Sequence, residues 1–162
     1  MYDELRKRGT RRVLSAEPLF RIHAELADIL KLGDTPYGER RIVNILGGHV
    51  EGARLAGRVL PGGADWQIIR RDGVTDLDAR YAIESEAGAR IFVLSQGMRH
   101  GPPDVIARLA RGESVDPALY YFRTAMRFET SDAGAAWLNR ILAIGYGARA
   151  NRQVTIEVFE VL

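Results

Sequence analysis

Short segments in which apolar and polar residues alternate with a period of two fill most of the chain. Such alternation, in segments rich in β-branched and aromatic residues, is typical of strands with one buried face. Glycine-containing pairs such as Gly47-Gly48, Gly62-Gly63 and Asp72-Gly73 separate several of these segments. The pattern predicts an all-β, antiparallel protein with strands near residues 18–30, 39–46, 50–60, 65–71, 75–85, 90–97, 119–130, 140–148 and 153–161.

One segment breaks the alternation and predicts a short helix at 103–111. Proline in the first turn and glycine just past the end are the usual limits of a helix, and Pro102-Pro103 and Gly112 stand at these places. Between them the apolar residues recur with helical spacing: Val105, Ile106, Leu109 and Ala110. A further helical turn is expected around 133–140.

Two architectures suit so many antiparallel strands. A sheet of about eight or more strands can close into a barrel, which removes its edges and can hold one small ligand. A two-sheet sandwich is the alternative, and the pattern alone leaves both open. The chain has 162 residues, 46% of them hydrophobic, so residues 13–162 are expected to form a single domain with one core.

Charge is concentrated at the N-terminus. The whole chain has a formal net charge of +2, but residues 1–12 hold five basic and two acidic side chains, which leaves −1 on the other 150 residues. We therefore expect a basic N-terminal arm at 1–12, frayed or partly helical, and no nucleic-acid partner for the body of the protein. No apolar run of about 20 residues could cross a bilayer and no signal peptide is visible, so we expect a cytoplasmic protein without a membrane partner.

Two of the expected strands carry charged and polar residues on the face opposite their apolar residues: Arg80 in one, and Tyr121, Arg123 and Glu129 in the other. In the first interpretation these charged faces lie in water and the apolar faces form the core. In the second, the charged faces line a polar lumen, where Arg80 and Arg123 offer paired donors to an anionic or carbonyl oxygen.

Asp65-Trp66 follows a glycine turn at the start of a strand. Asp65 could hold the turn while Trp66 closes one barrel end, or the pair could supply a base and an aromatic wall to a ligand site. Of the three histidines, His23 is expected at the surface and His49 in a turn, and His100 is the one candidate acid or base.

Several kinds of site have no counterpart in the sequence. There are no cysteines, no histidine pair with helical metal-ligand spacing and no grouping of histidine with carboxylate, so no metal site is expected. No phosphate-binding loop and no serine nucleophile motif are present either. The sequence therefore predicts a protein without a cofactor.

Ordered motifs along the chain resemble the DUF3237 family, also called UPF0311. The resemblance runs from about Pro18 to the C-terminus and leaves the basic arm outside it. The motifs that carry it are VLPGGADW at 59–66, DG at 72–73, LDARY at 77–81, RHGP at 99–102, YYFRT at 120–124, FET at 128–130 and WLN at 137–139.

This resemblance implies a calycin-like antiparallel β-barrel of about 8–10 strands, small and bacterial, with a ligand-sized interior. It does not imply an activity, because fold does not carry function by itself. Six residues stand at family motif positions: Glu51, Trp66, Arg80, Tyr121, Arg123 and Glu129. We therefore expect a polar or mixed lumen that contains some of them.

Two function classes follow. The first is a cofactor-independent lyase, isomerase, cyclase or hydrolase that acts on an oxygenated, aromatic or cyclic small molecule, with Glu51 or Asp65 as the base, Arg123 as the oxygen-binding group and Tyr121 beside them. The substrate-binding residues are then expected to be Trp66, Arg80, Tyr81, Glu129, His100 and Arg40. The second class is a non-catalytic small-molecule binding barrel. The presence of both a base and an oxyanion stabiliser favours the enzyme, and we expect a homodimer in either case.

Overall fold

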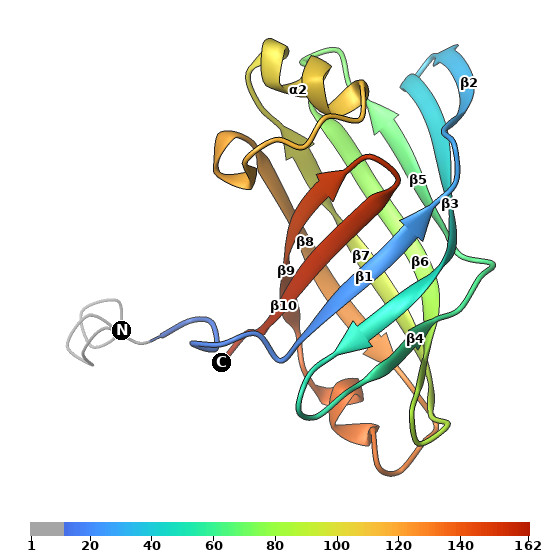
Figure 1. Cartoon of the computed structure of the whole chain (residues 1–162), viewed down its shortest axis with the longest axis vertical. Coiled ribbons are helices and arrows are strands. Elements are labelled where there is room, and N and C mark those ends of the chain that lie inside the picture. Colours follow the sequence, from blue (N-terminus) through green and yellow to red (C-terminus); the bar gives the residue numbers. More distant parts are fainter. Residues whose placement is uncertain (1–11) are drawn as a thin grey trace.

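The computed structural model describes residues 12–162, and Figure 1 shows them as a barrel with a helix at one end. Most of the expected basic arm falls on residues 1–11, which lie outside the described residues. The described elements are β1 (Phe20–Leu26), β2 (Leu30–Thr35), β3 (Gly38–Glu51), β4 (Gly57–Val59), β5 (Ala64–Ile69), β6 (Thr75–Ser85), β7 (Arg90–His100), α2 (Pro103–Ala110), the short 3-10 helix η1 (Pro117–Leu119), β8 (Tyr121–Glu129), the 3-10 helix η2 (Ala136–Arg140), β9 (Ala143–Ala150) and β10 (Gln153–Glu160).

The strands form one antiparallel sheet that closes on itself. β1 pairs with β10 on one side and with β3 on the other, and this double pairing closes the barrel. β4 and β5 share one position between β3 and β6, while β2 lies beside the first half of β3. The result is a closed eight-strand barrel with two extra strands and one α-helix, so the barrel prediction is confirmed over the sandwich.

β3 is longer than the alternation predicts, because Gly47 and Gly48 do not end it. The expected strand at 39–46 continues through both glycines to Glu51, with an irregular register where β1 pairs with it. Gly48 has φ +136°, and a side chain there would overlap the carbonyl oxygen of His23 on β1. The glycine therefore permits the close approach of two strands rather than a turn. His49, expected in a turn, lies on this strand.

Two other strand predictions are corrected. Only Gly57–Val59 of the expected strand 50–60 forms β4, because the chain leaves the sheet after β3. β2 was not predicted at all. Its residues Leu30 to Asp34 are all exposed, so β2 has no buried alternating face that the pattern could reveal.

The helix prediction is confirmed by α2, whose buried residues Val105 and Leu109 pack against the core. The helical turn expected around 133–140 is present as η2. In Figure 1, α2 lies at the end of the barrel where β7 and β9 finish, and the orange turn of η2 lies at the opposite end. No helix within residues 12–162 is long and apolar enough to span a membrane.

The barrel interior changes in character along its axis. Near η2 it is a packed apolar plug, whose fully buried side chains include Phe20, Ile83, Ile91, Leu138 and Val158. Phe20 also packs edge-to-face against Phe128, with ring centroids 5.7 Å apart. Toward the α2 end, polar side chains enter the interior. Chemistry inside the barrel is therefore confined to the middle and the α2 end.

Candidate functional site

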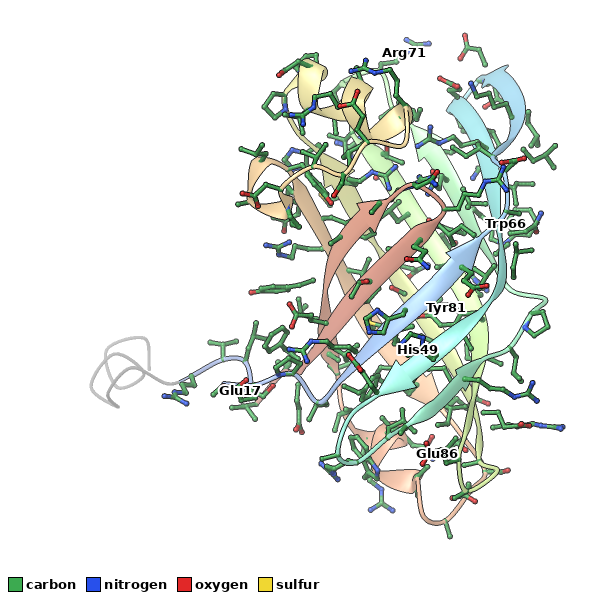
Figure 2. The ribbon with its side chains drawn as sticks, viewed as in Figure 1. Glu17, His49, Trp66, Arg71, Tyr81 and Glu86 are labelled. Atoms are coloured by element: carbon green, nitrogen blue, oxygen red, sulfur yellow. The ribbon has the colours of Figure 1, made fainter. Side chains whose placement is uncertain are left out.

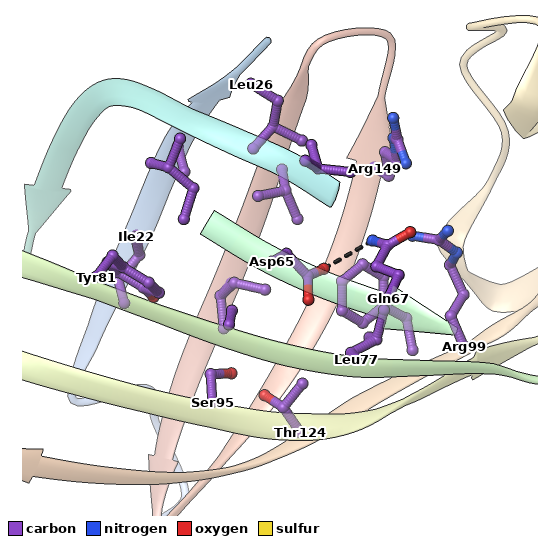
Figure 3. Close-up of a pocket in the computed structure, with 17 residues that line it drawn as sticks. Ile22, Leu26, Asp65, Gln67, Leu77, Tyr81, Ser95, Arg99, Thr124 and Arg149 are labelled. Atoms are coloured by element: carbon purple, nitrogen blue, oxygen red, sulfur yellow. Dashed lines mark hydrogen bonds between the residues drawn. The ribbon is translucent and has the colours of Figure 1, made fainter. Parts of the chain in front are cut away.

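An interior cavity lies between the apolar plug and the α2 end of the barrel (Figure 3). Its volume of about 50 Å³ holds a few water molecules. It is narrower than the ligand-sized interior that the family resemblance implies, because side chains such as Leu77 and Ile156 fill the barrel. The polar residues of its lining are Asp65, Gln67, Tyr81, Ser95, Arg99, Thr124 and Arg149.

These polar side chains enter the barrel because of their parity along the strands. Alternate residues of a strand point to the same face of the sheet. On β7, Arg99 shares its face with Ile91 and Val93, which are fully buried. On β5, Asp65 and Gln67 are likewise two residues apart and both line the cavity.

Asp65 is the one carboxylate in the cavity lining. Gln67 Nε2 donates a hydrogen bond to Asp65 Oδ2 at 2.7 Å, and the backbone N–H of Asp78 donates to Oδ1 at 3.0 Å. Arg41 Nε donates in turn to Gln67 Oε1 at 2.8 Å, which fixes the orientation of the amide. Burial raises the pKa of Asp65, although these hydrogen bonds and the charges of two nearby arginines lower it. Asp65 therefore binds a proton more readily than an exposed aspartate.

Three arginines act electrostatically on Asp65 or on one another at this end: Arg41, Arg99 and Arg149. Arg99 is 7% exposed, and burial together with the like charges of Arg149 and Arg41 lowers its pKa to about 10. Burial also lowers the pKa of Arg41 and Arg149. Within residues 12–162, no carboxylate forms an ion pair within 4.0 Å of any of the three. The site thus holds an excess of positive charge that an anionic group would neutralise.

Neutral hydroxyl groups complete the interior. Burial and the charge of Asp65 raise the pKa of Tyr81, so its hydroxyl stays protonated at neutral pH. Thr124 is 5% exposed, and its hydroxyl has no hydrogen-bond partner among the described residues. The hydroxyl of Tyr120 accepts a hydrogen bond from the backbone N–H of Arg149 at 3.0 Å. This contact fixes the backbone that carries the third arginine.

Of the ten residues predicted for the site, Asp65 and Tyr81 line the cavity. The other eight lie elsewhere. Trp66, between the inward-facing Asp65 and Gln67, is 46% exposed on the outer side of β5 (Figure 2). Its expected role as a barrel plug or an aromatic wall is therefore wrong, because neighbouring residues of a strand point to opposite faces.

Arg123, expected to bind the substrate oxygen, lies on the outer face of β8. Its guanidinium carbon lies 4.0 Å from the ring centroid of Tyr146 and 5.4 Å from that of Tyr121, and its Nη1 donates to the carbonyl oxygen of Phe122 at 2.8 Å. Tyr121 is 45% exposed and stacks on His100, with ring centroids 5.0 Å apart. The inward face of β8 is taken by Phe122, Thr124, Met126 and Phe128, so Arg123 and Tyr121 point outward. His100 follows the inward-facing Arg99 on β7, so it also points outward, and all three predicted residues lie outside the cavity.

Arg80 and Arg40 also point away from the cavity. Arg80 is exposed and pairs with Asp78 at 3.4 Å on the outer face of β6. Arg40 alternates with Arg41 on β3, and it is Arg41 that reaches Gln67. The interpretation in which the charged faces lie in water is the correct one for these strands.

The two predicted carboxylates Glu129 and Glu51 are exposed. Glu129 lies at the end of β8, and Glu51 is at the end of β3, where its Oε1 lies 3.0 Å from His23 Nε2. The hydrogen bond from His23 lowers the pKa of Glu51, whereas burial in a closed site would raise the pKa of a carboxyl group. Glu51 therefore lies outside the cavity, away from its arginines.

Sequence reasoning missed Arg41, Gln67, Arg99 and Arg149. A signal for the three arginines was present, because each stands on an apolar or small-residue face of its strand. Gln67 shares its face with Asp65, so it had no such signal. Arg41 has the parity of Val43 and Ile45, just as Arg99 has that of Ile91 and Val93. In this barrel, Arg41 and Arg99 stand at the end of an apolar face and reach the interior, whereas Arg80, on a polar face, points outward.

A second group of side chains gathers on the outer face where β1 meets β3. His23 and His49 are direct cross-strand partners, and their rings stack with centroids 4.4 Å apart. One ligand atom each from His23, His49 and Glu51 lies within 4.8 Å of the other two. The expected absence of a histidine and carboxylate grouping is therefore wrong, since strand pairing joins residues that sequence spacing separates.

Solved structures of other proteins share this fold. A crystal structure of a conserved protein of unknown function from Rhodopseudomonas palustris matches with a TM-score of 0.89 at 43% identity, covering 94% of this chain and 100% of that one. A β-barrel-like protein from Acinetobacter baumannii matches with a TM-score of 0.79 at 38% identity, covering 94% and 99%. An enzyme from Penicillium herquei has a TM-score of 0.69 at 20% identity over 95% and 99%, a likeness of fold alone.

Sequence comparisons identify relatives over nearly the whole chain. A UPF0311 protein of Rhodopseudomonas palustris is 44% identical over 149 residues, covering 92% of this chain and 97% of the relative. A UPF0311 protein of Clostridium acetobutylicum is 35% identical over 149 residues, covering 91% and 94%. The family model described as protein of unknown function, DUF3237, matches residues 14–161. The chain therefore belongs to the DUF3237 family, also called UPF0311, as the ordered motifs in its sequence predicted.

Proposed function

We propose that the barrel interior binds a small molecule through a negative or polarised oxygen, and that Asp65 transfers a proton to or from that molecule. One observation carries the proposal. A single cavity brings a carboxyl group with a raised pKa next to arginines that form no ion pair within residues 12–162.

The roles follow from charge and burial. Arg99 and Arg149 stay protonated at neutral pH, so they hold an oxygen on which negative charge develops. When that oxygen belongs to a carbonyl group of the substrate, Asp65 accepts a proton from the carbon next to the carbonyl. The electron pair of the broken C–H bond moves to the carbonyl oxygen and forms an enolate. Return of the proton to a different carbon of the enolate gives an isomerase. Departure of a leaving group from the neighbouring carbon gives a lyase, and attack of the enolate carbon on an electrophilic carbon of the same molecule gives a cyclase. The proton transfer itself requires no cofactor.

The lining also limits the substrate. Aliphatic and aromatic residues dominate the cavity, which favours a cyclic or aromatic carbon skeleton with one oxygen-bearing end. Such a ligand needs more room than about 50 Å³, so side chains of the α2 end must move when it enters. The negative oxygen then faces Arg99 and Arg149, and the skeleton faces the apolar plug.

A non-catalytic binding barrel is the second candidate. It is favoured by the excess of arginine over carboxylate, since the arginines alone suffice to hold an anion. In this case Asp65 only orients Gln67. Binding and proton transfer must therefore be measured separately.

The binding test compares benzoate with benzamide, which has a similar shape and no charge. We expect benzoate to raise the melting temperature and to bind in calorimetry, and benzamide to do neither. Arg99→Met should abolish the response to benzoate, whereas Arg80→Met, an exposed arginine on the outer face, should leave it unchanged. An equal response of both variants would place the anion site outside the cavity.

The proton-transfer test uses phenylpyruvate, an aromatic anion with an exchangeable carbon-bound proton next to its carbonyl. We expect the protein to accelerate exchange of that proton in D₂O, followed by NMR. Asp65→Asn should bind phenylpyruvate and lose the acceleration, while Asp78→Asn, on the outer face beside Arg80, should keep it. Binding by the wild-type protein without any exchange would support the non-catalytic barrel instead.

A further inference from the structure

The outer face of the barrel carries a cluster that the proposed function does not use. His23 on β1 and His49 on β3 are paired across the strands, and Glu51 is two residues further along the same face of β3. His49 and Glu51 are exposed, and His23 is half-buried. The cluster lies at the pairing that closes the barrel, outside the interior cavity.

We propose that His23, His49 and Glu51 bind one divalent transition-metal ion of the Zn²⁺ type. Two imidazoles and a carboxylate are ligands that Zn²⁺ takes in proteins, and a fourth position stays open to water. One ligand atom from each residue lies within 4.8 Å of the other two, and His23 Nε2 is 3.0 Å from Glu51 Oε1. Ligand atoms of a tetrahedral zinc site are about 3.3 Å apart, given metal–nitrogen bonds of about 2.0 Å.

His23 is already oriented for this role. Its Nδ1 lies 3.2 Å from the hydroxyl of Thr155 on β10, which leaves Nε2 directed at Glu51. A partner on the second ring nitrogen fixes the orientation of most metal-binding histidines. His49 has to tilt out of its stack on His23, and its exposure permits that rotation.

Nearby positive charges are compensated by other groups. Arg21, opposite Glu51, pairs with Glu157 at 3.0 Å, and Arg58, opposite His49, pairs with Glu84 at 2.9 Å. Among the described residues, Glu51 therefore has no arginine within ion-pair distance. Its ion-pair partner there is His23. Replacing the His23 contact with a metal ion costs one exposed hydrogen bond.

A bound ion would connect β1 to β3 across the closing pairing. Because an ion that binds only the folded chain stabilises it by mass action, Zn²⁺ should raise the melting temperature. The effect requires ligands from both strands, so loss of either histidine should remove it.

The test uses Zn²⁺ alone with untagged, chelator-treated protein, followed by calorimetry and thermal melts. The chain has three histidines, so His100→Ala is a matched control that removes an exposed histidine outside the cluster. We expect one equivalent of Zn²⁺ to bind to the wild-type protein and to His100→Ala with equal affinity. His49→Ala and Glu51→Gln should each weaken binding by at least about tenfold.

Co²⁺ provides a second readout that does not depend on stability. A site with two imidazoles and a carboxylate should give an intense tetrahedral visible absorption, and His49→Ala should abolish it. Unchanged far-UV circular dichroism of the variants shows that they fold. The proposal is overturned if wild-type protein binds no Zn²⁺ equivalent, or if His100→Ala weakens binding as much as His49→Ala does.

Discussion

Thr124 is a residue whose surroundings do not satisfy its chemistry. Its hydroxyl is buried beside the cavity and has no hydrogen-bond partner among the described residues. An unsatisfied buried hydroxyl costs about 1–3 kcal/mol, whereas an apolar group of the same shape avoids that cost. Within the protein, Thr124 is therefore a weak point, and its hydroxyl faces the cavity, where a ligand could use it.

Replacing Thr124 with valine should stabilise the protein without a ligand. We expect a rise of about 2–4 °C in melting temperature, which corresponds to about 1 kcal/mol in a chain of this size. Thr155→Val, whose hydroxyl contacts His23, is the control and should give no gain. A lower melting temperature for Thr124→Val would show that the hydroxyl has a partner.

Asp65 determines a second prediction at this scale, through pH. Its pKa is raised in the folded protein, so the folded chain retains this proton to a higher pH than the unfolded chain does. Ionisation of Asp65 therefore destabilises the fold above the folded pKa, and this effect disappears as the pH falls toward the unfolded value. Asp65→Asn mimics the protonated form, so it should raise the melting temperature at pH 8 and lose this advantage near pH 4. Melts of both proteins across that range decide the sign, and an advantage that grows toward acid pH would contradict the raised pKa.

At the scale of elements, Gly47 and Gly48 let β3 come close enough to β1 for the two strands to pair and close the barrel. A side chain at Gly48 would overlap the backbone of β1, and φ is +136° there. Gly33 on β2 has φ +96° but open space around it. The two glycines therefore separate the effect of strain from the effect of overlap.

Gly33→Ala should cost about 1 kcal/mol for its positive φ, whereas Gly48→Ala should cost on the order of 3 kcal/mol or more. The measurement is the free energy of unfolding in urea. Equal losses in the two variants would show that β1 can shift to make room for the added methyl group.

The strands were easier to predict from the sequence than the site was. Alternation shows which residues of a strand share a face, and it located β6, while the helical spacing between Pro103 and Gly112 located α2. It does not show which face is inside when both faces carry large or polar residues, as at Trp66 and Asp65. Nor does it show which strands pair, so the approach of His23 to His49 could not be predicted. Local pattern is encoded over a few residues, whereas closure depends on strands far apart in the chain.

At the scale of the whole molecule, the outer face of β7, β8 and β9 remains to be explained. Met98, Tyr121 and Tyr146 are 40%, 45% and 37% exposed there, and they lie around Arg123. Exposed apolar groups that gather in one place are typical of contact surfaces. We propose that this face forms the contact of the homodimer that the sequence led us to expect.

Light scattering should report twice the mass of one chain, and Tyr146→Glu should reduce it to that of a monomer. Phe92→Glu is the control, because Phe92 is an exposed aromatic residue of β7 away from Arg123, and this variant should keep the dimer. A monomer for the wild-type protein at working concentration would rule out this assembly.

The double pairing of β1 also has a consequence for the order of folding. Ile22 pairs with Val50 on β3, which is close in the chain, and with Ile156 on β10, which is near its far end. Loop-closure entropy makes distant pairings form later than local ones. β1 can therefore join β3 early, while its other edge stays unpaired until β10 arrives. During that interval the unpaired edge of β1 is a template for a strand from another chain, so the folding intermediate is more prone to aggregation than the finished barrel.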